Sequence, residues 1–271
     1  MSNHAKKPVI AFKFMEGQYA VPSLEKARVK VTRVRDLNDP FEFRHRTKPH
    51  ELPDMLRLLN DPKNRDRWRA VLRDSGRSVP GHISDGMKLR AARAMLNESD
   101  SHLEWLAAKL DEARVLSLAR TAFPLLLWAH YAESHKGVAL GFDLSGTSAG
   151  NVEYTNTMPD IGAWEDSSKI LQLMLTKSRD WQYEQECRIL LEQSELVEEG
   201  GVEFVEFGPR PLRQVIAGAR SSAQLKSELR RVLSEERYQH VVYLEASCSS
   251  IEYKIEFNEV ERNDDGVLVG A

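Results

Sequence analysis

The chain has 271 residues, of which 41% are hydrophobic and 29% charged, and 38 basic and 41 acidic residues leave a formal net charge of −3. This balance excludes a disordered chain and an integral membrane protein, and the overall charge does not indicate a polyanionic partner. No segment approaches the roughly 18 apolar residues of a membrane-spanning helix, and too few apolar residues follow the first lysines for a signal peptide, so we expect a cytoplasmic protein. Cys187 and Cys248 lack the paired spacing of a zinc site, and we expect two buried thiols and no metal centre.

The first segments predict a strand, a helix and a strand. Residues 8–14 (PVIAFKF) have the pattern of a short buried strand, a helix is expected to begin at Val21-Pro22-Ser23, and residues 29–34 (VKVTRV) alternate as a strand. A turn follows at Asn38-Asp39-Pro40, because a residue before proline is disfavoured in helical geometry.

Residues 51–113 predict a helical insertion. Four stretches have apolar residues at three- and four-residue spacing, among them residues 65–72 (RDRWRAVL), and Val79-Pro80-Gly81 divides the block. The many arginines between residues 65 and 93 suit a solvated helical face better than a nucleic-acid surface, because acidic residues are mixed among them. We expect most of them to be exposed and the block to supply no reacting group.

The remaining chain is rich in predicted strands. They are expected at residues 114–118, 137–143, 186–191, 202–207, 212–216, 240–245 and 251–257, with helices at 124–134 and 223–235 and a frayed tail at 263–271. Together these elements predict a single α+β domain over residues 1–271, with a mixed, mainly antiparallel sheet and the insertion at 51–113.

The predicted helix at 124–134 concentrates aromatic and titratable side chains. Trp128, Tyr131 and His135 have three- and four-residue spacing, which places them on one helical face, whereas His130 falls off that face. His135 either enters a pocket or caps the end of the helix.

The segment KSRDWQYEQECRIL, residues 177–190, has two carboxylates beside a guanidinium. Glu184, Glu186 and Arg188 alternate along a predicted strand and share one face. Such a group can keep one carboxylate ionised while the other binds a hydroxyl or acts as a base. The alternative is a surface ladder of ion pairs, which the adjacent Trp181 and Tyr183 make less favoured.

The loop LNDPFEF, residues 37–43, is either a binding edge or a structural turn. Lys13 on the first strand is either an inward-facing cation or an outward-facing lysine on an edge strand, with the edge slightly favoured. Combining the three segments, we predict one pocket, and its lining residues are expected to be Lys13, Asn38, Tyr131, His135, Glu184 and Glu186.

The order of these motifs resembles a widespread bacterial family known as a domain of unknown function. Its marks here are LNDPFEF, then W-A-H-Y-A-x-x-H-x-G-V from Trp128, then K-x-x-x-W-x-Y-E-x-E-x-R from Lys177, within a resemblance that runs from about Lys13 to Gly218. The signatures for nucleotide-binding loops, zinc proteases and serine hydrolases are absent from the sequence.

The layout also resembles, more weakly, the ADP-ribosyltransferase-like fold of bacterial toxins and defence proteins. This resemblance implies that NAD is the substrate, that Glu186 is the catalytic carboxylate and that Glu184 serves the acceptor. It implies further that NAD is bound by Lys13, Asn38, Trp128, Tyr131, His135, Trp181 and Arg188. The departures are Lys13, where those families have His or Arg, and Ser117, which stands without the rest of a Ser-Thr-Ser triplet.

Two other classes of function stay open. One is a metal-dependent nuclease or hydrolase in which Asp39, Glu42, Glu184, Glu186 and His135 gather a divalent ion. The other is a non-enzymatic sensor with a nucleotide in the aromatic pocket. For the favoured transferase, the expected partners are a macromolecular acceptor, protein or nucleic acid, and a neutralising partner protein, with no membrane.

Overall fold

A computed structural model describes residues 9–47, 51–64, 84–162 and 167–269. The chain divides into two compact units, the first comprising Met1–Glu42, Ala113–Asn156 and Leu175–Ala271, and the second Phe43–Glu112 and Thr157–Met174. The helix predicted at 65–72 and the break at 79–81 lie outside the described residues. A single domain with an insertion at 51–113 stays a prediction, and the second unit also includes residues 157–174, which the sequence left unassigned.

The first unit is built on a mixed, mainly antiparallel sheet, which confirms the predicted α+β class. Its path through the described residues is β16 (Ile255–Glu259), β15 (Val242–Cys248), β14 (Leu212–Ala217), β6 (Val138–Asp143), β1 (Ile10–Met15), β5 (Arg114–Ala119), β11 (Glu186–Leu191) and β7 (Gly150–Asn151). The β14–β15 pair is parallel and the other pairs on this path are antiparallel.

Smaller strands surround this sheet. The predicted strand VKVTRV is divided in two: β2 (Arg28–Lys30) joins β13 (Val202–Glu206) and β12 (Leu196–Glu199), whereas β3 (Thr32–Arg33) pairs with β5. Parallel strands β8 (Glu153–Thr155) and β10 (Thr176–Ser178) form a separate pair. The 3-10 helices of this unit are η1 (Val34–Asp36), η3 (Arg179–Glu184), η4 (Gln193–Glu195) and η5 (Glu236–Tyr238).

The sheet opens between its two central strands. β1 pairs with β6 at six positions and β5 pairs with β11 at six, but β1 and β5 pair at one position, Phe12 opposite Ala119. The described residues of these two strands have no second paired position, and side chains can enter the space between the strands.

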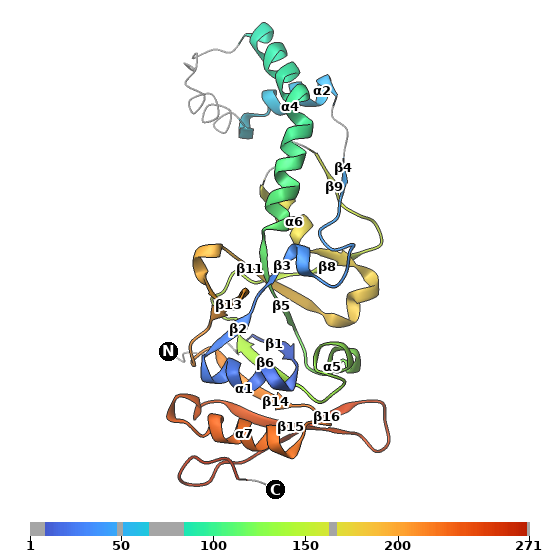
Figure 1. Ribbon diagram of the computed structural model, residues 1–271. Coiled ribbons are helices and arrows are strands. Elements are labelled where there is room, and N and C mark those ends of the chain that lie inside the picture. Colours follow the sequence, from blue (N-terminus) through green and yellow to red (C-terminus); the bar gives the residue numbers. More distant parts are fainter. Residues whose placement is uncertain (1–8, 48–50, 65–83, 163–166, 270–271) are drawn as a thin grey trace, which may run out of the picture. The chain divides into compact units, whose positions relative to one another are not determined.

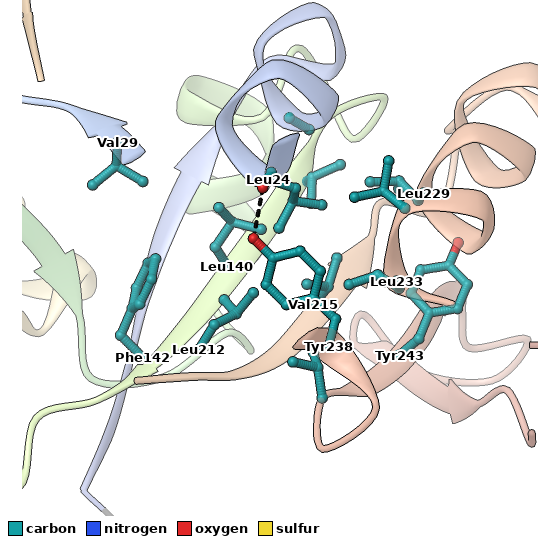
Figure 2. Packing of buried hydrophobic residues seen from close by; sticks show 14 of the residues in the cluster. Leu24, Val29, Leu140, Phe142, Leu212, Val215, Leu229, Leu233, Tyr238 and Tyr243 are labelled. Atoms are coloured by element: carbon teal, nitrogen blue, oxygen red, sulfur yellow. Dashed lines mark hydrogen bonds between the residues drawn. The ribbon is translucent and has the colours of Figure 1, made fainter. Parts of the chain in front are cut away.

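Helices α1 (Gly17–Glu25) and α7 (Ala223–Leu233) pack together and cover one face of the sheet (Figure 1). The core beneath them gathers aliphatic residues around the ring of Tyr238, whose hydroxyl donates to the Leu24 carbonyl at 2.6 Å (Figure 2). Helix α5 (Leu125–Tyr131) packs on alternate residues of the same strands, where Trp128 lies edge-on to Phe14 at 5.0 Å. Burial on both faces accounts for the nearly continuous apolar sequence of β6.

The second unit is mainly helical within its described residues. It contains α2 (Leu52–Asn60), η2 (Pro62–Asn64), α4 (Asp85–Asp111), α6 (Ser167–Met174) and the short parallel pair β4 (Arg46–Thr47) and β9 (Asp160–Ile161). Helices α2 and α4 bury Met55, Ala92 and Met95 in a small core of their own. The described arginines of the predicted insertion, Arg57, Arg90 and Arg93, are exposed as expected.

Several predicted boundaries were wrong. Helix α1 begins at Gly17, before the expected start, and the last strand begins at Ile255 because the preceding residues form an exposed bend in which Ile251 is 86% exposed. The predicted frayed tail is ordered as far as Val269, since Leu268 is buried and bridges to Arg262. Cys187 is buried, but Cys248 is exposed. No helix among the described residues is both long and apolar enough to cross a membrane.

Candidate active site

The opening between β1 and β5 holds a pocket of about 420 Å³ in the first unit. It takes its wall from strands β1 and β5, from the loop after η1, from α5 and from the segment β10–η3–β11. Five of the six residues predicted to line it do so: Lys13, Asn38, Tyr131, Glu184 and Glu186. The chain therefore brings its three unusual segments together, while the chemical roles assigned to them stay predictions.

One ammonium group organises the acidic wall of the pocket. Lys177 is almost fully buried, and its Nζ lies 2.8 Å from Glu42, 2.7 Å from Glu184 and 3.0 Å from Glu186. Burial would lower the pKa of this lysine, but the charges of Glu186, Glu42 and Glu184 outweigh it and raise the pKa above its usual value. Three carboxylates are thus held within reach of one cation.

Glu186 is fixed by further partners. Its carboxylate accepts from Arg188 Nε at 2.7 Å, the Ser117 hydroxyl also bonds it, and its main-chain N–H donates to the Tyr154 hydroxyl at 2.7 Å. Burial would raise the pKa of Glu186, but Arg188 and then Lys177 overcome that cost and lower the pKa to about 2. An ionised carboxylate is therefore held rigidly at the pocket wall.

The pKa of Glu184 is shifted in the opposite direction, above its usual value. It ends η3, and Gln185 adopts the left-handed region at φ 45° before β11 begins, so both glutamates reach Lys177. The Tyr131 hydroxyl donates to Glu184 at 2.6 Å and also bonds the Asn38 side chain. Burial raises the pKa of Glu184 and the favourable charges of Lys177 offset only part of it. Two neighbouring carboxyls with pKa values moved apart suit different roles in acid–base chemistry.

Lys13 is on an interior strand, so the slight preference for an edge position was wrong. β1 lies between β6 and β5, and the Lys13 Nζ enters the pocket and donates to the Ser117 carbonyl at 3.3 Å. Desolvation lowers the pKa of this lysine to about 8.

Trp128 and His135 lie away from the pocket, contrary to prediction. Helix α5 ends at Tyr131, and Glu133, Ser134 and His135 all have positive φ, so His135 is not one helical turn beyond Tyr131. Trp128 is fully buried, its Nε1 donates to the Ala122 carbonyl at 2.7 Å, and the His135 ring stacks on it with centroids 6.4 Å apart. Both belong to the core packing beside α5.

Trp181 and Arg188 also lie outside the pocket lining. Trp181 Nε1 donates to Asp39 at 2.7 Å, and its ring lies 5.0 Å from the Lys177 ammonium. Arg188 is buried and bonds both Glu42 and Glu186. These residues position the acidic wall and are not placed to contact a ligand.

Three residues outside the predicted pocket lining have a place in the site. Lys177 and Glu42 complete the ion network, and His130 lines the pocket with its Nδ1 3.0 Å from the Tyr183 hydroxyl. Lys177 stands seven residues before Glu184, and only the turn made by η3 brings it back. A buried pair of carboxylates needs a nearby cation, and this requirement could have indicated a lysine such as Lys177 from the sequence.

A divalent metal does not fit this geometry. Glu42, Glu184 and Glu186 converge on an ammonium group, while Asp39 binds Trp181 and His135 lies elsewhere. Among the described residues, no group of three His, Cys, Asp or Glu side chains is arranged to hold a metal ion.

Comparisons with protein-family models, curated proteins and solved structures found no match to this chain. The resemblances to the two families therefore stay predictions.

Proposed function

We propose that the pocket binds NAD and that the protein is an ADP-ribosyltransferase-like enzyme, which releases nicotinamide and transfers ADP-ribose to a macromolecule. The observation that carries this proposal is the Glu186 carboxylate, which is buried, paired with Arg188 and Lys177, and part of the pocket wall. Breaking the bond between nicotinamide and ribose builds positive charge on the sugar, and a fixed carboxylate stabilises such a transition state.

The surrounding side chains fit the other needs of the reaction. Lys13 supplies a cation for the pyrophosphate, replacing Arg188, which is committed to Glu42 and Glu186. Tyr131 offers an aromatic ring beside which the leaving nicotinamide stacks. Glu184, with its raised pKa, accepts a proton from the acceptor nucleophile.

The acidic wall of the pocket contains more carboxylates than cations. Lys177 and Arg188 neutralise part of the acidic wall, but three carboxylates face these two cations. The wall therefore carries surplus negative charge whenever Glu184 is ionised. That surplus favours a cationic sugar over a neutral one in the same place.

The wider biological role is part of the same proposal. A toxin or defence enzyme of this kind acts in the cytoplasm on a protein or nucleic acid, and it requires a neutralising partner in the cell that makes it. No separate feature of the described residues favours the metal-dependent alternative.

The test is to incubate the protein with labelled NAD and lysate, and to measure NAD binding, nicotinamide release and label transfer separately. The proposal expects all three in the wild type. Glu184→Gln is expected to reduce transfer more than nicotinamide release, because Glu184 acts on the acceptor. Tight binding without nicotinamide release would replace this assignment with the nucleotide-binding sensor.

A further inference from the structure

Two of the three lysines that line the pocket, Lys13 and Lys177, have opposite surroundings. The Nζ of Lys177 touches three carboxylates. The Nζ of Lys13 donates to the main-chain carbonyl of Ser117 at 3.3 Å, and among the described residues it makes no ion pair. Lys13 thus holds a desolvated amine beside a cavity without the direct contact that keeps Lys177 charged.

As a consequence, a substantial fraction of the Lys13 amine is neutral near physiological pH. Desolvation disfavours the ammonium, the charge of Glu186 offsets only part of that cost and Lys30 adds to it, so the pKa of Lys13 is about 8. At about pH 7.5 roughly a quarter of such groups are neutral, against about 0.1% for a lysine with an ordinary pKa. A neutral lysine amine is a nucleophile for carbonyl carbon.

We propose that Lys13 is a covalent binding site for small aldehydes, which it holds as an imine. The Nζ lone pair forms a bond to the carbonyl carbon, and the resulting carbinolamine then loses its hydroxyl. The carbonyl oxygen and the two protons of the neutral amine leave as one water molecule. The step involves no oxidant or reductant, and it goes beyond the NAD reaction because it uses no NAD.

The pocket suits both the addition of the aldehyde to the Lys13 amine and the loss of the hydroxyl from the carbinolamine. Its volume of about 420 Å³ admits a small molecule to the Lys13 amine, and Phe12, Leu118 and Leu127 give it an apolar side that suits a short hydrocarbon chain. Glu184 lines the same cavity, and its raised pKa favours the protonated form that can donate to the departing hydroxyl.

The experiment uses propanal as the probe and cyanoborohydride to trap the imine as a secondary amine. The full chain is treated without NAD, and the labelling rate of each lysine is followed by peptide mass spectrometry. Lys30 lines the same pocket and is exposed, so it controls for access. Lys177 controls for a buried amine that is paired with carboxylates.

Lys13 is expected to be labelled at least about tenfold faster than Lys30 at neutral pH, with little labelling of Lys177. The advantage over Lys30 is expected to shrink as the pH rises above about 8, where ordinary lysines gain neutral amine. In Lys13→Arg, which keeps the charge and removes this nucleophile, the fast site is expected to disappear without transfer of label to Lys177.

Equal labelling of Lys13 and Lys30 would overturn the inference, as would a fast site that persists in Lys13→Arg. Because the reaction contains no NAD, neither result depends on whether the protein cleaves NAD.

Discussion

The first unit contains two buried carboxylates with similarly lowered pKa values, Glu186 and Glu203, in very different settings. Glu203 is shared by Arg33 and Arg114, which bond it at 2.9–3.2 Å and lower its pKa to about 2. Glu186 reaches the same value among three carboxylates and two cations, at the wall of a cavity that Glu203 does not line. A perturbed pKa is therefore common to both clusters, and the cavity and the surplus of carboxylates distinguish the candidate site.

The comparison predicts that the two clusters differ most in their response to the loss of a cation. Lys177→Met leaves three buried carboxylates around an apolar side chain, and it is expected to lower the free energy of unfolding by about 3–5 kcal/mol. Arg33→Met is the matched change, and it is expected to cost about 1 kcal/mol because Arg114 still pairs with Glu203 and Arg33 is partly exposed.

Denaturant unfolding of both variants checks this difference. The cost of Lys177→Met is expected to fall between pH 7 and about pH 5, because protonation of the crowded carboxylates relieves their repulsion. Equal costs for the two variants would remove the distinction between the clusters.

The acid sensitivity of the fold offers a second comparison. A carboxyl whose pKa is lower in the folded state stabilises the fold above its unfolded pKa, and that contribution is lost as the pH falls toward the folded value. For Glu186 and Glu203 the window runs from 4.5 down to about 2. Glu186→Gln is expected to remove up to about 3 kcal/mol at pH 7, and Glu203→Gln about 1 kcal/mol after solvent screening near Arg33.

Unfolding free energies of the two variants and the wild type, measured from pH 7 to pH 2, check that this stabilisation is lost as the pH falls. Both variants should approach the wild type at the acid end. A cost that is the same at pH 2 and pH 7 would show that packing, and not the charge of the carboxylate, accounts for the loss.

Substitution of Lys13 is expected to change the free energy of unfolding by a smaller amount and in the opposite direction. Its folded pKa of about 8 lies below the ordinary 10.5, so it destabilises the fold fully below pH 8, and this penalty disappears as the pH rises toward 10.5. Lys13→Met should therefore raise the free energy of unfolding at pH 7 by about 1–3 kcal/mol, with little difference from the wild type near pH 10.5. A loss of stability at pH 7 would contradict the unpaired, desolvated state of this amine.

The elements that the sequence predicted well are those with uninterrupted patterns. β11 spans Glu186–Leu191 as expected, and α7, β6 and β14 agree within one or two residues, because each buries a regular apolar face. Two- and three-residue strands such as β7 and β8 were missed, since so short a segment has no period to detect.

The sequence predicted which segments form the site, but it did not predict the contacts that their side chains make. Local spacing placed Glu186 and Arg188 on one face correctly, because both belong to one strand. Spacing failed for His135, since three consecutive non-glycine residues with positive φ end the helical geometry on which the argument depended. Lys177 was overlooked as the centre of the network because its three partners are separated along the chain and meet only through tertiary folding.

The most direct test of the account is the rate of nicotinamide release from NAD by the wild type, Glu186→Gln and Glu203→Gln. Both substitutions remove a buried, ionised carboxylate, but only Glu186 faces the pocket. The account predicts release by the wild type, a loss of about 10²–10³-fold in Glu186→Gln with NAD binding retained, and a wild-type rate in Glu203→Gln. No release by the wild type, or an unchanged rate in Glu186→Gln, would contradict the assignment of this pocket to NAD cleavage.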